Sequence, residues 1–202
     1  MTDVRFNKML IWTNALVPLT LLGYDAVRGQ LGANPVEFFL RTTGVLTLTF
    51  LFLTLAVTPL RRVSGINELI KYRRVLGLFA FFYGCIHLIT YTVFDRGLSF
   101  SGTVADVIQR PFIAIGMTAF LLMVPLAITS TNKMVKRLGG KQWQRLHRLI
   151  YLVGILGVIH FWMIVKSDIF YPAMFGLVLL VLLGYRVYSR AKPKLATRRS
   201  TA

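Results

Sequence analysis

The chain has 202 residues, of which 55% are hydrophobic and only 15% are charged. It is too apolar for an ordinary soluble domain and too short to hold a large soluble domain beside a membrane part. The net charge of +17 would suggest nucleic-acid binding in a soluble protein. Here the basic residues fall between apolar runs, so membrane topology accounts for them and we expect no nucleic-acid partner. The single cysteine, Cys85, excludes an intrachain disulfide, a covalent CxxCH haem attachment and a cysteine-ligated cluster.

Six apolar runs are each near the length that spans a bilayer. In chain order they cover about residues 9–24, 42–60, 75–94, 111–130, 149–165 and 169–188. Continuous runs of this length exclude the alternating strands of a membrane barrel. The sequence therefore predicts an all-α integral membrane protein with six transmembrane helices. The second run is expected to close at Pro59, and Pro111 is expected at the first position of the fourth helix. No internal repeat stands out.

Basic residues are distributed very unequally between the two ends of these predicted helices. Nineteen of the 24 Lys and Arg residues lie before the first run, within residues 61–74 and 133–148, or from Arg186 to the end of the chain. The other five are Arg28, Arg41, Arg96, Arg110 and Lys166. The positive-inside rule therefore predicts that both termini are cytoplasmic. We divide the chain into a transmembrane domain, residues 1–190, and a basic cytoplasmic tail, residues 191–202, whose charges favour contact with membrane lipid.

Two histidines lie inside apolar runs, where an ionisable side chain is costly and a function is the default hypothesis. His87 lies thirteen residues after Arg74, and His160 lies twelve residues after Arg148. Both helices are predicted to run outward, so both histidines lie roughly 18–20 Å from the cytoplasmic ends. Two imidazoles at equal depth on two helices suit the two axial ligands of a b-type haem iron. The alternative is a buried imidazole that is hydrogen-bonded to a backbone carbonyl.

Each of these histidines follows a glycine by three residues. Gly84 precedes His87 and Gly157 precedes His160, and residues three apart share a helix face. A missing side chain on that face would leave room for a flat macrocycle. Close helix–helix contact through small residues is common in membranes and explains the two glycines equally well.

The third histidine, His147, lies among arginines at the predicted cytoplasmic edge of the fifth helix. It precedes His160 by thirteen residues, a rise of about 20 Å, so it could serve a second, inner haem. The same spacing places it roughly 140° around an ideal helix from His160. An inner haem also lacks an obvious second ligand, because Arg73 lies on the matching face of the third helix. A guanidinium has no lone pair for a metal, although it could pair with a haem propionate.

Six segments together resemble the MsrQ (YedZ) family, the haem-binding membrane subunits of bacterial periplasmic methionine-sulfoxide reductase systems. They are RRVLGLFAFFYGCIHLITY (residues 73–91), RPF (110–112), LAITST (126–131), WQRLHRLIYLVGILGVIHFWMIVK (143–166), LGANP (31–35) and TPLRR (58–62). The wider group is the ferric-reductase-like transmembrane domain, whose full members carry two histidines on each of the third and fifth helices and hold two haems. This chain has Arg73 where one of those histidines would fall. The resemblance implies an outer haem on His87 and His160 and leaves an inner haem at His147 open.

The resemblance also implies a function and a location. The chain would be a multi-pass protein of the bacterial inner membrane that carries electrons, an electron-transfer subunit rather than a complete enzyme. Electrons would come from a cytosolic flavin reductase or a quinol. They would go to an MsrP-like periplasmic molybdopterin methionine-sulfoxide reductase, which repairs oxidised proteins. The family is associated with FMN, but no flavin motif is visible here.

Two other functions stay open. A small transporter or channel would use the buried histidines as proton relays or substrate ligands, and it would be colourless. A quinol-oxidising cytochrome b anchor of another dehydrogenase would share the haem and differ in its electron donor.

Overall fold

The computed structural model describes residues 4–165 and 167–199, and this part of the chain is almost entirely helical. The elements in chain order are α1 (Val4–Val27), α2 (Pro35–Ser64), the 3₁₀ helix η1 (Asn67–Lys71), α3 (Arg73–Thr90), the π-helix η2 (Tyr91–Asp95), α4 (Phe100–Gln109), α5 (Pro111–Ile128), α6 (Asn132–Leu138), α7 (Gly140–Leu146), α8 (Leu149–Ile164) and α9 (Phe170–Arg199).

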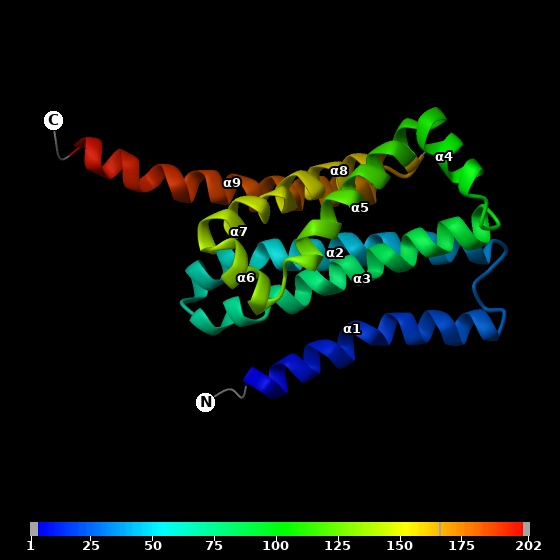
Figure 1. Ribbon diagram of the computed structural model, residues 1–202, viewed down its shortest axis with the longest axis horizontal. Coiled ribbons are helices and arrows are strands. Elements are labelled where there is room, and N and C mark those ends of the chain that lie inside the picture. Colours follow the sequence, from blue (N-terminus) through cyan, green and yellow to red (C-terminus); the bar gives the residue numbers. More distant parts are fainter. Residues whose placement is uncertain (1–3, 166, 200–202) are drawn as a thin grey trace.

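Six helical stretches are long and apolar enough to cross a membrane, and each corresponds to one of the six predicted runs. The prediction of an all-α membrane protein with six transmembrane helices is therefore confirmed. Pro111 occupies the first turn of α5, as predicted. The start of α1 and the end of α9 lie toward the same end of the bundle, together with α6 and α7, and α4 lies at the opposite end (Figure 1). Which end faces the cytoplasm stays a prediction.

The segment that the sequence analysis separates as a basic tail begins inside a helix. α9 continues without a break from Phe170 to Arg199, across the boundary at residue 190. Residues 200–202 lie outside the described part of the chain. The division into a domain and a tail stays a prediction.

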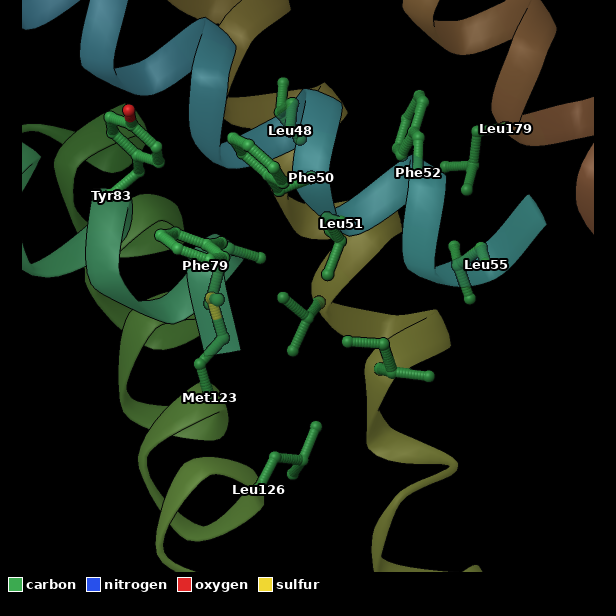
Figure 2. Close-up of a cluster of buried hydrophobic side chains, with 14 of the residues drawn as sticks. Leu48, Phe50, Leu51, Phe52, Leu55, Phe79, Tyr83, Met123, Leu126 and Leu179 are labelled. Atoms are coloured by element: carbon green, nitrogen blue, oxygen red, sulfur yellow. The ribbon is translucent and has the colours of Figure 1, made fainter. Parts of the chain in front are cut away.

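The core is organised around α2, which is the most buried of the six spans. Its side chains Leu48, Leu51 and Leu55 lie at the centre of an apolar cluster. Figure 2 shows these residues together with Phe79 from α3 and other apolar side chains from α5 and α9. Because α2 lies at the centre of this cluster, it helps to fix the positions of α3 and α8, the helices that carry His87 and His160.

The prediction that the second helix closes at Pro59 is wrong. α2 continues through Pro59 and ends at Ser64, where Gly65 adopts a left-handed conformation and caps the helix. A proline in a helix leaves the carbonyl four residues earlier without its usual N–H donor. That carbonyl belongs to Leu55, and it accepts a hydrogen bond of 2.6 Å from Nη2 of Arg186 on α9. Arg186 therefore satisfies the backbone group that the proline leaves free, and the helix can continue.

Candidate functional site

The structure brings His87 and His160 together inside the bundle. His87 lies near the end of α3 and His160 near the end of α8. The centres of the two imidazole rings are 6.3 Å apart, and the ring planes are perpendicular, at 90°. The matched depth of these residues in the sequence therefore corresponds to a direct pairing in space.

One nitrogen of each ring is held by a backbone carbonyl of a neighbouring helix. Nδ1 of His87 lies 3.0 Å from the carbonyl oxygen of Leu40 on α2. Nδ1 of His160 lies 2.7 Å from the carbonyl oxygen of Phe112 on α5. A carbonyl can only accept, so Nδ1 carries the proton in each ring. Nε2 has no hydrogen-bond partner among residues 4–165 and 167–199 and keeps its lone pair.

The two rings face a cavity of about 790 Å³. Its walls come mainly from the first halves of α2, α5 and α9 and the second halves of α3 and α8, so it lies toward the α4 end of the bundle. Most of the lining is apolar, with Leu51, Phe120 and Phe161 among the contributing residues. A cavity of this size, with apolar walls and two convergent imidazoles, has the character of a cofactor site.

Gly84 and Gly157 both line this cavity, and both also lie in close helix contacts. A Cβ atom at Gly157 would come within 2.8 Å of Cδ2 of Leu48 on α2. A Cβ atom at Gly84 would lie 3.5 Å from the ring of Phe120 on α5. Both explanations of these glycines, room for a macrocycle and close helix–helix contact, are therefore compatible with the structure. At Gly157 the helix–helix contact is the tighter constraint.

Two glycines that the sequence analysis did not select lie against the histidine rings themselves. A Cβ atom at Gly44 on α2 would lie 3.3 Å from Cε1 and Nδ1 of His87. A Cβ atom at Gly116 on α5 would lie 2.7 Å from the same two atoms of His160. Sequence spacing along one helix could not reveal these contacts, because each joins two different helices.

A polar network lies at the α4 rim of the cavity. Tyr91, which lines the cavity, donates a hydrogen bond to Oδ2 of the buried Asp106 on α4. Nε of Arg96 lies 2.5 Å from Oδ2, and Nε of Arg110 lies 3.3 Å from Oδ1 of the same carboxylate. Tyr91 begins the π-helix η2, a rare element that is frequent at functional sites. The sequence analysis did not predict this network.

His147 lies in a second cavity, of about 520 Å³, toward the end of the bundle where α1 begins and α9 ends (Figure 1). The helix is interrupted at His147 and Arg148, between α7 and α8. Nε2 of His147 lies 3.0 Å from Oγ1 of Thr129. The ring of Trp143 stacks on the imidazole with 3.9 Å between the ring centres. The structure therefore places His147 apart from the other two histidines.

The second cavity is rich in guanidinium groups. Its lining includes Arg62, Arg73, Arg74, Arg148 and Arg186. Among the described residues, Arg73 forms no hydrogen bond or ion pair. Such a cavity suits an anionic group, because planar guanidinium groups bind carboxylates and phosphates well.

Comparison with known proteins adds a family to this geometry. A family model described as a ferric reductase like transmembrane component matches residues 43–158, which include His87 and His147 and end just before His160. A protein from Herminiimonas arsenicoxydans is 51% identical over 183 residues, which cover 90% of this chain and 84% of that protein. One from Ralstonia nicotianae is 49% identical and covers 92% of this chain and 87% of its own length. Both are named protein-methionine-sulfoxide reductase heme-binding subunit MsrQ.

The chain belongs to the MsrQ family. A further member, from Xanthomonas euvesicatoria, is 44% identical and covers all of this chain and 93% of its own length. The family resemblance seen in the sequence is confirmed. The six apolar helices and the match to a transmembrane family show that the chain is a multi-pass membrane protein.

Proposed function

We propose that the chain is a b-type cytochrome that holds a haem between His87 and His160 and passes electrons across the membrane. The observation that carries this proposal is the 6.3 Å between the two ring centres. Two imidazoles that share one metal ion through facing nitrogens would have their ring centres at roughly this separation, because a metal–nitrogen bond is about 2.0 Å long. When bound there, the haem would supply one-electron chemistry, for which the protein provides position, ligands and polarity.

The hydrogen bonds at Nδ1 support this proposal. A histidine that binds a metal commonly donates its other ring N–H to a carbonyl, which fixes the tautomer and the ring orientation. Leu40 and Phe112 provide such carbonyls to His87 and His160. The ring nitrogen left over, Nε2, is the one that would bind iron. The residues present therefore fit a haem with two histidine ligands, and the number of cysteines excludes a covalent attachment.

The direction of electron transfer follows from the predicted topology. We place the basic end of the bundle, with both termini and the proposed tail of residues 191–202, in the cytoplasm of a bacterial inner membrane. The haem site then lies near the periplasmic side. Electrons would enter from a cytosolic flavin reductase or a quinol. They would leave to a periplasmic molybdopterin methionine-sulfoxide reductase. The names of the relatives, which describe haem-binding subunits of a protein-methionine-sulfoxide reductase, support an acceptor of that kind. The chain would be the electron-transfer subunit of that system.

The second cavity is, in this proposal, the site at which electrons enter the protein. His147 and Arg73 could hold an inner haem, or the arginines could bind the phosphate of FMN, which family resemblance suggests. Arg73 would pair with a propionate or a phosphate, since a guanidinium offers no lone pair to iron. His147 would bind iron through Nδ1, or through Nε2 after losing its contact with Thr129. The guanidinium groups in the lining support an anionic cofactor. Because this cavity holds one histidine and the outer cavity holds two, an inner cofactor would have a different set of ligands from the outer haem.

The experiment is to measure haem per protein and reduced-minus-oxidised spectra on the purified protein and on His87→Ala, His160→Ala and His147→Ala. We expect a b-type spectrum that is lost in both His87→Ala and His160→Ala and restored in part by added imidazole. His147→Ala is the matched control for the outer haem, which it should retain. A colourless wild-type protein would refute the proposal and favour a transporter. Close to two haems per protein, with one lost in His147→Ala, would assign an inner haem to the second cavity.

A further inference from the structure

The two histidine rings are held by the same arrangement on two different helix pairs. Gly44 on α2 contacts the ring of His87, and Gly116 on α5 contacts the ring of His160. In both cases the carbonyl that accepts from Nδ1 belongs to the residue four positions before the glycine. The histidine follows that carbonyl by 47 residues in one pair and by 48 in the other. Two such arrangements with nearly the same internal spacing point to a common role.

We propose that Gly44 and Gly116 are positioning residues, which seat the rings of His87 and His160 so that their planes stay perpendicular when haem is bound. This inference rests on the proposed haem site and adds to it the residues that set ligand orientation. Neither glycine has a positive φ angle, so backbone conformation does not require glycine at either position. Glycine is also less favourable than alanine inside a helix. The contact with the ring is therefore the feature that explains each glycine.

The space at Gly116 is too small for any side chain. A methyl group there would lie 2.7 Å from Cε1 and Nδ1 and 3.1 Å from Nε2 of His160, and real Cβ atoms essentially never approach other atoms within 3.0 Å. The ring would have to move, but its 2.7 Å hydrogen bond to Phe112 opposes that movement. A side chain at this position must therefore rotate or displace the imidazole and weaken the hydrogen bond.

The space at Gly44 is tight but less extreme. A methyl group there would lie 3.3 Å from Cε1 and Nδ1 of His87, so a shift of a few tenths of an ångström would relieve the contact. The hydrogen bond of this ring to Leu40 is longer, at 3.0 Å, and tolerates more movement. The two positions should thus give a graded response, strong at Gly116 and mild at Gly44.

Ring orientation has a spectroscopic signature that is separate from activity. When two axial imidazole planes are perpendicular, they interact equally with two iron d orbitals, and low-spin ferric haem gives a single strong low-field electron paramagnetic resonance (EPR) feature. When the planes turn toward parallel, those orbitals split and a three-line rhombic spectrum appears. The hydrogen bond at Nδ1 also raises the basicity of the ligand, so its weakening should raise the reduction potential of the haem.

The test compares ferric EPR spectra, haem content and haem potential in the wild type, Gly116→Ala, Gly44→Ala and Gly154→Ala. The last variant is the matched control. Gly154 lies on α8, where a Cβ atom would meet Cδ1 of Leu179 at 3.2 Å and no histidine. We expect the single low-field feature in the wild type and in Gly154→Ala. Gly116→Ala should lose haem affinity about ten- to a hundred-fold, the usual cost of disturbing such a hydrogen-bonded ligand, and its remaining haem should be more rhombic.

Gly44→Ala should keep its haem and show a smaller shift toward a rhombic spectrum. A rhombic wild-type spectrum would overturn the inference while leaving the haem site in place. So would unchanged spectra and haem content in both ring-facing variants. If Gly116→Ala does not accumulate, Gly44→Ala decides alone, and an unchanged EPR spectrum in it overturns the inference. A wild type that binds no haem would instead refute the proposed function itself.

Discussion

Arg186 should stabilise the bundle chiefly because Pro59 leaves the Leu55 carbonyl without a donor. Nη2 of Arg186 donates to that carbonyl at 2.6 Å, and Nη1 donates to the hydroxyl of Tyr151 at 2.8 Å. We therefore predict that Arg186→Met is strongly destabilising in the wild type and much less so in a Pro59→Ala background. Alanine at position 59 restores the N–H that normally bonds to the carbonyl four residues earlier.

The magnitude follows from the two hydrogen bonds. A hydrogen bond from a charged group contributes about 1.5–3 kcal/mol, and Leu55 is fully buried, so no water replaces the lost donor. The hydrogen bond to Tyr151 adds about 1 kcal/mol. Loss of Arg186 should therefore cost about 3 kcal/mol in the wild type. With Pro59→Ala the first contribution disappears, so the coupling between the two positions should be about 2 kcal/mol.

The assay is a double-mutant cycle by chemical denaturation in detergent micelles, with helix content or tryptophan fluorescence as the signal. The protein should be prepared without added cofactor, because Arg186 also lines the second cavity. Arg186→Lys is a useful fifth variant, since it keeps the charge and loses the planar fork that reaches both acceptors. If Arg186→Met costs the same free energy in both backgrounds, the carbonyl freed by the proline is not what Arg186 stabilises.

Three further predictions concern packing, the histidine contacts and topology. Gly157→Ala should destabilise the protein by about 1–3 kcal/mol through overpacking, whereas Gly184→Ala, which has open space around it, should not; thermal unfolding of the two variants checks this. Thr43→Val should leave the haem spectrum unchanged, because the Thr43 hydroxyl is 3.5 Å from Nδ1 of His87 and bonds instead to its own helix; a changed spectrum would show that this long contact matters. A fluorescent-protein fusion at the C-terminus should be fluorescent, and a phosphatase fusion within residues 96–99 should be active; the reverse pattern would invert the topology.

The six spans could be predicted from sequence because a membrane leaves few alternatives. Every backbone polar group must be satisfied within the segment, so a long apolar run has to be helical. The same reasoning failed at Pro59, where the missing donor is replaced from α9, more than a hundred residues away in the chain. It also missed α4, whose ten residues are too few to span a bilayer and include the buried Asp106.

The histidine pair could be predicted because depth along a helix is readable from the positions of charged residues. The residues that hold the rings could not be found in this way. Spacing along one helix indicates only Gly84 and Gly157, which lie three residues before the histidines. The rings instead lie against Gly44 and Gly116, and those contacts depend on which helices are neighbours. The one available signal was that both of these glycines lie near the starts of predicted spans, whereas the two histidines lie in the second halves of theirs.

The two halves of the histidine site follow the order of the helices along the chain. α2 is followed, after the short η1, by α3, and α5 is followed, after the short α6 and α7, by α8. In each hairpin the first helix supplies a carbonyl and a glycine, and the second supplies the histidine that uses them. Each half of the site is therefore built within one hairpin, and only the distance between the hairpins has to be fixed by packing. The apolar cluster around Leu51 on α2 fixes that distance, because it packs α2 against α3, α5, α8 and α9 at once. A mutation in this cluster should therefore change the separation of the two rings without disturbing the hydrogen bond of either one.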